Sequence, residues 1–109
     1  MASVYKVLGQ SAPSATTETD LYTVPGATSA VCSSISVCNR GGTSTTFRVS
    51  VSAGGGTTAN KDYIYYDVPI AANDTFVATL GITLATTAKV RIYAGNANLS
   101  FNLFGTELS

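Results

Sequence analysis

Short runs of alternating apolar and polar residues, each ended by a cluster of turn residues, recur along the whole chain. The clearest run is 45–53, where Phe47, Val49 and Val51 alternate with polar residues. A period of two is the period of a β-strand with one buried face. Turn pairs such as Pro25-Gly26 separate the runs, and no run has a helical period. The sequence therefore predicts an all-β fold without substantial helix.

The spacing of these runs predicts an antiparallel β-sandwich of about eight strands. A chain of 109 residues forms one domain with a single core. The segment 9–20 is polar and without periodicity, so it is predicted to be a loop or a mobile arm. Periodicity leaves the topology open between jelly-roll and immunoglobulin-like. The expected strands are 3–8, 21–24, 29–39, 45–53, 61–69, 75–84, 88–94 and 99–104.

The chain carries unusually few charges for a folded domain. Charged residues make up 11% of the sequence and the net charge is zero, against roughly 25% charged residues in ordinary domains. Little long-range repulsion then keeps copies of the molecule apart. This composition favours a chain that tolerates or needs neighbours; the alternative is a neutral secreted β-domain.

Several classes of partner are disfavoured by the sequence. The six basic residues are dispersed, so they form no electrostatic footprint for nucleic acid. No apolar stretch approaches the roughly 18 residues that a membrane span needs. The N-terminal segment has no apolar core of a secretion signal. We expect synthesis in a cytosol, without nucleic-acid or membrane partners.

Catalytic and metal-binding signatures are also missing from the sequence. The chain has no His, which excludes Ser–His and Cys–His nucleophile pairs. Cys32 and Cys38 lie about 20 Å apart along one expected strand, too far apart to pair with each other, and without His they suggest no metal site. Asp62 and Asp67 fall on opposite sides of their strand. The sequence predicts no enzyme activity, no cofactor and no metal.

Three tyrosines occur in four positions of the run 61–69, KDYIYYDVP. One side of this run is mostly aliphatic and is predicted to face the core: Ile64, Tyr66, Val68 and Ile70. Tyr63 and Tyr65 then point outward, as Tyr93 does in its own strand. Because tyrosine is enriched at interfaces, we predict an interface that includes these three residues. The alternatives are ordinary cross-strand pairing on an exposed sheet and a stacking platform for sugars.

Four stretches cover most of the chain: KVLGQSAPSATTETDLYTVPGATSAVCSSISVCNRGG, TTFRVSV, KDYIYYDVPIAANDTFVATLGITL and VRIYAGNANLSFNLFG. Their pattern resembles that of small structural proteins of tailed bacteriophages. The resemblance is to proteins of phages that infect cyanobacteria and marine bacteria in the first place. The resemblance extends from about Lys6 to Gly105 and carries no site residues. It implies a virion component present in many copies, on the capsid surface or on the neck or tail.

From this resemblance we expect a non-enzymatic virion protein, synthesised in the host cytoplasm. The favoured interpretation is a capsid decoration or cement protein that stabilises the particle. It would form a homo-oligomer, with a trimer favoured, and contact other virion proteins such as the major capsid protein. The alternatives are a neck, tail or baseplate component, and a carbohydrate-binding module for receptor recognition that uses Tyr63, Tyr65 and Tyr93. A small pilus-like subunit is disfavoured because no secretion signal is seen.

Overall fold

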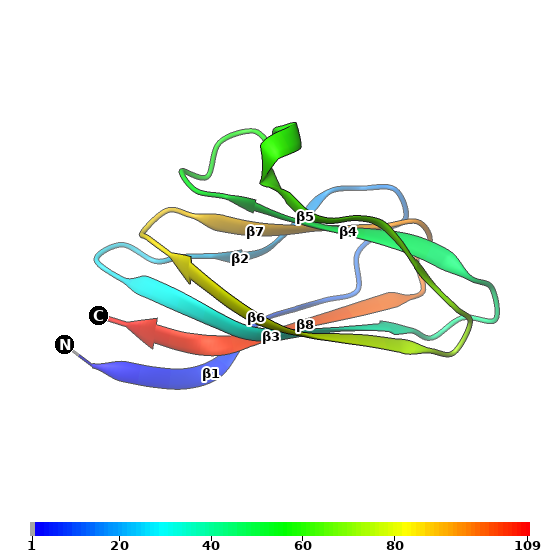
Figure 1. The fold of residues 1–109 in the computed structure, drawn as a ribbon, viewed down its shortest axis with the longest axis horizontal. Helices are drawn as coiled ribbons and strands as arrows, with labels where there is room; N and C mark the ends of the chain where they lie inside the picture. Colours follow the sequence, from blue (N-terminus) through cyan, green and yellow to red (C-terminus); the bar gives the residue numbers. More distant parts are fainter. Residues whose placement is uncertain (1) are drawn as a thin grey trace.

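The computed structural model describes residues 2–109 and is a sandwich of two four-stranded antiparallel sheets (Figure 1). Its only helical element in that range is the short 3-10 helix η1 (Asn60–Asp62). The predicted all-β sandwich is thus confirmed. The strands are β1 (Ser3–Ser11), β2 (Thr19–Thr23), β3 (Ser29–Asn39), β4 (Thr45–Ser52), β5 (Tyr63–Ile70), β6 (Thr75–Leu84), β7 (Lys89–Ala94) and β8 (Leu99–Leu108).

The strand order decides between the two expected topologies. One sheet has the order β1-β8-β3-β6 and the other has the order β2-β7-β4-β5. Only the β4–β5 connection stays within one sheet, and every other connection crosses to the opposite sheet (Figure 1). The pairs β1–β8, β2–β7, β3–β6 and β4–β5 are those of one long hairpin wrapped around a core. This arrangement is a jelly roll, whereas immunoglobulin sheets keep several consecutive strands together.

The core lies between the inner faces of both sheets. Phe47 of β4 is completely buried at its centre, with ring centroids 5.2 Å from Phe76 and 6.2 Å from Phe101. Phe47 and Val49 of β4 face the core as predicted, and along β6, β7 and most of β8 burial alternates as a period of two requires. The largest fully buried side chains come from both sheets and from the loop after β2: Phe47, Phe101, Ile35, Ile92, Leu99, Leu103, Val24, Val37 and Val49.

The loop predicted over 9–20 is shorter than expected. Strand β1 continues to Ser11 and pairs Gly9 with Leu103 of β8. Strand β2 begins at Thr19, and Thr16 donates a backbone hydrogen bond to the carbonyl of Ala94. The connection between these strands is therefore 12–18. It is tied to the β7–β8 corner at Thr16.

A β-bulge in β3 overturns part of the predicted alternation there. The register slips between Cys32 and Ser34, so one residue has no direct partner in the ladder. Cys32 consequently lies in the core and is fully buried, while Val31 is turned toward the outer face. Strict alternation along 29–39 predicts Val31, Ile35 and Val37 on one side and Cys32 on the other, so Val31 and Cys32 are reversed. Beyond the bulge, Ile35 and Val37 are buried as predicted.

Bulges in β5 overturn the predicted faces of the tyrosine strand in the same way. The register against β4 slips twice, on either side of Tyr65. Asp67 adopts a positive φ of 51°, which is uncommon for a residue other than glycine. Tyr65 therefore packs against the core, whereas Ile64 and Tyr66 are exposed. Val68 is partly buried and Ile70 is buried, as predicted.

Candidate interaction surfaces

The three tyrosines predicted to form an interface do not share one surface. The ring of Tyr65 lies 5.3 Å from Phe76 and 6.4 Å from Phe47, within the inner layer of the sandwich. Tyr63 stays on the outer face, where its ring meets Tyr66 edge to face at 4.9 Å. Strict alternation places Tyr66 in the core, but the bulge at Asp67 turns Tyr66 outward. The outward aromatic pair is thus Tyr63 and Tyr66.

Arg48 joins this pair to Tyr93 on the outer face of the β2-β7-β4-β5 sheet. Its guanidinium carbon lies 4.3 Å from the ring centre of Tyr66 and 4.4 Å from that of Tyr93. Arg48 Nε also donates to the Asp67 carboxylate over 2.7 Å. Cation–π contact and an ion pair therefore hold the bulge of β5 against β4 and β7. We call Arg48, Tyr63, Tyr66, Asp67 and Tyr93 the arginine–tyrosine cluster.

A second ionic group lies on the same outer face, on β2 and β7. Asp20 accepts from Lys89 Nζ over 3.0 Å and from Arg91 Nε over 2.9 Å. Hydrogen bonds from Lys89 and then Arg91 hold the pKa of Asp20 below its usual range. Arg91 also donates to the carbonyls of Gly55 and Gly56, which fixes the loop that carries η1 over this sheet (Figure 1). The face is charged, but its charges are paired with one another.

Tyr22 and Glu107 connect the two sheets between β2 and β8. The hydroxyl of Tyr22 donates to Glu107 Oε2 over 2.6 Å, and Lys6 Nζ lies 3.0 Å from Glu107 Oε1. The hydrogen bond from Tyr22 and then that from Lys6 lower the pKa of Glu107. Burial, followed by the hydrogen bond to Glu107, raises the pKa of Tyr22. Tyr22 therefore stays protonated at neutral pH while Glu107 stays ionised.

This link predicts a defined pH dependence of stability. Because the pKa of Glu107 is lower in the folded protein, its contribution is complete above the unfolded pKa, about 4.3 for a glutamate, and is lost as pH falls through the folded pKa. Glu107→Gln is expected to lower the free energy of unfolding at pH 7 and to lower it by less at pH 2.5, which lies below the unfolded pKa. Urea unfolding of both proteins over this range measures the difference. An equal loss at both pH values would contradict the role of the charge, and Tyr22→Phe should remove only part of the effect because Lys6 remains.

The outer face of the β1-β8-β3-β6 sheet has a different character. Alternation and register place a broad set of side chains on it, and all of them are uncharged. We call this surface the neutral face. It consists of Ser3, Tyr5, Val7 and Gln10 of β1, Ser100, Asn102, Phe104, Thr106 and Leu108 of β8, Ser29, Val31, Ser34, Ser36 and Cys38 of β3, and Thr75, Val77, Thr79 and Thr83 of β6.

Large apolar side chains on the neutral face are exposed. Tyr5 is 84% exposed and Val77 is 67% exposed, and Val7 lies directly opposite Phe104 in the ladder. Tyr5, Val31 and Leu108 lie near the chain ends, which meet as Figure 1 shows and where Ala2 and Ser109 exchange two backbone hydrogen bonds. Val7 and Phe104 lie next to them, in the middle of the face, and Val77 alone lies further along, in the row of Asn102. A charged side chain borders the neutral face at the end away from the chain ends, where Arg40 donates to Ser100 Oγ. The neutral face thus has an apolar end and a polar end.

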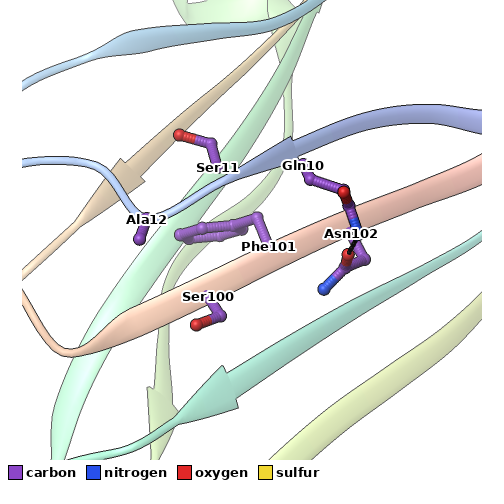
Figure 2. A pocket seen from close by; sticks show the side chains of 6 residues that line it. All are labelled: Gln10, Ser11, Ala12, Ser100, Phe101 and Asn102. Atoms are coloured by element: carbon purple, nitrogen blue, oxygen red, sulfur yellow. Dashed lines mark hydrogen bonds between the residues drawn. The ribbon is translucent and has the colours of Figure 1, made fainter.

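A shallow pocket of about 390 Å³ lies at the polar end, between β1 and β8. Figure 2 shows Gln10 and Asn102 side by side, joined by a hydrogen bond of 2.7 Å between their side chains. Small side chains, Ser11, Ala12 and Ser100, form much of the remaining wall, with Phe101 beneath. These groups are neutral hydrogen-bonding residues without an acid–base pair.

The two cysteines lie at different depths, with Cys32 buried and Cys38 partly buried. Burial raises the pKa of Cys32 to about 11, so its sulfur stays protonated at neutral pH. Both cysteines are unpaired, as the sequence predicted. Within the described range, no three His, Cys, Asp or Glu side chains lie together where they could hold a metal ion. No helix in that range is long and apolar enough to cross a membrane.

Comparison with known proteins does not assign the chain to a family. No protein-family model matches the sequence, and no curated protein matches it either. The two outer faces of the sandwich are the candidate interaction surfaces. The outer face of the β2-β7-β4-β5 sheet carries charged side chains whose ionic partners lie within the molecule. The neutral face is broad, uncharged and partly apolar.

Proposed function

We propose that this chain is a non-enzymatic structural protein of a tailed-phage virion, a homo-oligomeric decoration or cement subunit of the capsid. The observation that carries the proposal is the neutral face, which exposes Tyr5, Val7, Val77 and Phe104 on one side of a four-stranded sheet. Exposed apolar side chains that gather on one face mark a contact with another macromolecule. The resemblance of the sequence to small phage structural proteins supports the same function.

The proposed contribution is mechanical. The jelly roll offers the outer side of a four-stranded sheet to its neighbours. Burial of apolar surface between subunits stabilises an assembly by roughly 25 cal/mol for each Å² removed from water. The partners would be sister copies and other virion proteins such as the major capsid protein. Asp20, Asp62, Asp67 and Glu107 each bond a lysine or an arginine, which supports structural roles for these carboxylates. The protein would be found in the virion after synthesis in the host cytoplasm.

Mass spectrometry of purified virions tests this proposal. Particles of the phage that encodes the chain should contain it in many copies, in a constant ratio to the major capsid protein. The ratio should persist after the particles are banded by density. A chain that is abundant in the lysate but missing from banded particles would contradict the proposal. A fixed but low copy number would instead indicate a neck, tail or baseplate component.

A second candidate function, recognition of a carbohydrate receptor, is favoured by the arginine–tyrosine cluster. Tyr66 is exposed and lies beside the polar groups of Arg48 and Asp67, the combination of ring and hydrogen-bonding groups that suits a sugar. Under this alternative, Tyr66→Ala should abolish retention on a glycan array. Tyr5→Ala, on the opposite sheet, is the matched control and should leave retention unchanged. Equal retention of both variants would exclude the cluster as the sugar site.

A further inference from the structure

We propose that the neutral face binds a second copy of this chain, face to face, about a two-fold axis. The inference rests on the proposed function in one respect, because it names the neighbour that covers the neutral face. It is argued from the charges, the dimensions and the distribution of apolar residues on that face.

The absence of charge favours a copy of the same chain as the occupant. In a two-fold contact the same patch meets itself, so a charge near the axis approaches its own copy, and a charge elsewhere needs an opposite charge at the matching place on the same patch. The side chains of the neutral face are all uncharged, which removes this penalty. The outer face of the other sheet carries Asp20, Arg48, Lys89 and Arg91. Self-association through that face would require its ion pairs to be buried or broken.

The dimensions of the neutral face suit a stable dimer. Four strands spaced about 4.8 Å apart, with β3 running for 11 residues, present a surface of about 600 Å². Full overlap of two such faces would bury about 1,200 Å² in total, which reaches the lower end of specific protein interfaces. Two sheets packed face to face lie about 10 Å apart with their strands nearly aligned.

The apolar end of the face indicates the direction of the axis. Tyr5 lies toward the chain ends and the pair Val7 and Phe104 lies in the middle of the face, whereas the polar end holds Gln10 and Asn102 with Val77 as its one large apolar side chain. An axis parallel to the strands brings the two apolar ends together and aligns the strands of both sheets. Burial of apolar groups against each other is then favourable, and the polar ends keep access to water at the border.

Phe104 is the most informative position for a test because β8 is a central strand close to this axis. Its side chain is 37% exposed, and that of Ile64, on β5 in the other sheet, is 41% exposed. Phe104→Lys and Ile64→Lys therefore introduce the same charge at positions of equal exposure on opposite sheets. A lysine buried in the contact without a partner should weaken dimerisation at least a hundredfold.

Sedimentation velocity from 1 to 100 µM measures the association of each protein. We expect a dimer for the wild type and for Ile64→Lys, and a monomer for Phe104→Lys. Circular dichroism checks that each variant is folded, and Tyr5→Lys serves as the second variant on the same face should Phe104→Lys fail to fold. Mixing Phe104→Lys with Phe104→Glu should restore a dimer, since the two positions lie near each other across the axis.

The contradicting results separate this inference from the proposed function. A wild-type monomer at 100 µM would overturn the two-fold contact and leave a cement protein that binds only to its particle. A trimer, which the sequence favoured, would also overturn the two-fold contact while keeping the homo-oligomer. A dimer that survives both charged variants of the neutral face but is lost in Ile64→Lys would place the contact on the other sheet. Absence of the chain from purified virions would contradict the proposed function alone.

Discussion

Replacement of Phe47 by Ala is expected to cost about 3–5 kcal/mol of the free energy of unfolding. The ring is completely buried between the sheets and contacts the rings of Phe76, Phe101 and Tyr65. Truncation leaves a cavity that cannot collapse, because its walls are strands of both hydrogen-bonded sheets. Small domains are stable by only about 5–15 kcal/mol, so this change removes a large share of the total.

Urea unfolding of the wild type and of Phe47→Ala at one fixed protein concentration measures this loss. Phe47→Leu is the graded control and should cost about 1 kcal/mol, because it keeps much of the buried volume. A cost below about 1 kcal/mol for Phe47→Ala would mean that the two sheets are not tightly packed against this ring. The packing described for the sandwich would then be wrong.

The second large effect is expected at Gly105, where an added methyl group has no space. A Cβ at this position would lie 2.1 Å from the carbonyl oxygen of Val31 and 2.8 Å from Leu8 Cδ1. The first contact is with backbone, so β3 or β8 would have to move. Gly105→Ala is expected to destabilise the fold by about 3 kcal/mol or more.

Gly81→Ala in β6 is the matched control for this steric argument. A Cβ at Gly81 meets no atom within 4 Å, so the change is expected to be neutral within about 0.5 kcal/mol. Thermal unfolding of both variants, scanned at the same concentration, gives the comparison. Equal melting temperatures for the two variants would show that the backbones of β3 and β8 are not held in close contact around Gly105.

The sequence predicts the sandwich well where strands are regular and poorly where they bulge. The alternation in β4, β6, β7 and β8 identifies their buried faces correctly. In β5 the positive φ of Asp67 is held by Arg48 of the neighbouring strand, so no local signal marks the bulge. One extra residue reverses the side chains that follow it until a second slip restores them. Tyr65 and Tyr66 lie between the two slips of β5 and exchange their expected faces, whereas Tyr63 keeps its own.

The candidate surfaces were predictable only in part for a related reason. The outward positions of Arg48, Tyr63 and Tyr93 follow from the sequence. Their contacts with Tyr66 and Asp67 arise only because β4 pairs with β5 on one side and with β7 on the other. The neutral face combines strands from both ends and the middle of the chain. Its lack of charge becomes visible only when β1, β8, β3 and β6 are placed side by side. Strand order is information that periodicity does not contain.

The contact of the neutral face with a second copy is tested most directly by the accessibility of two methyl-bearing side chains. Val7, on the neutral face, is 44% exposed in the single subunit, and Ile64, on β5, is 41% exposed. Nuclear magnetic resonance of methyl-labelled protein with a dissolved paramagnetic agent reports their access to water. We expect the Ile64 methyl signals to broaden and the Val7 signals to stay sharp. Equal broadening of both would contradict a covered neutral face.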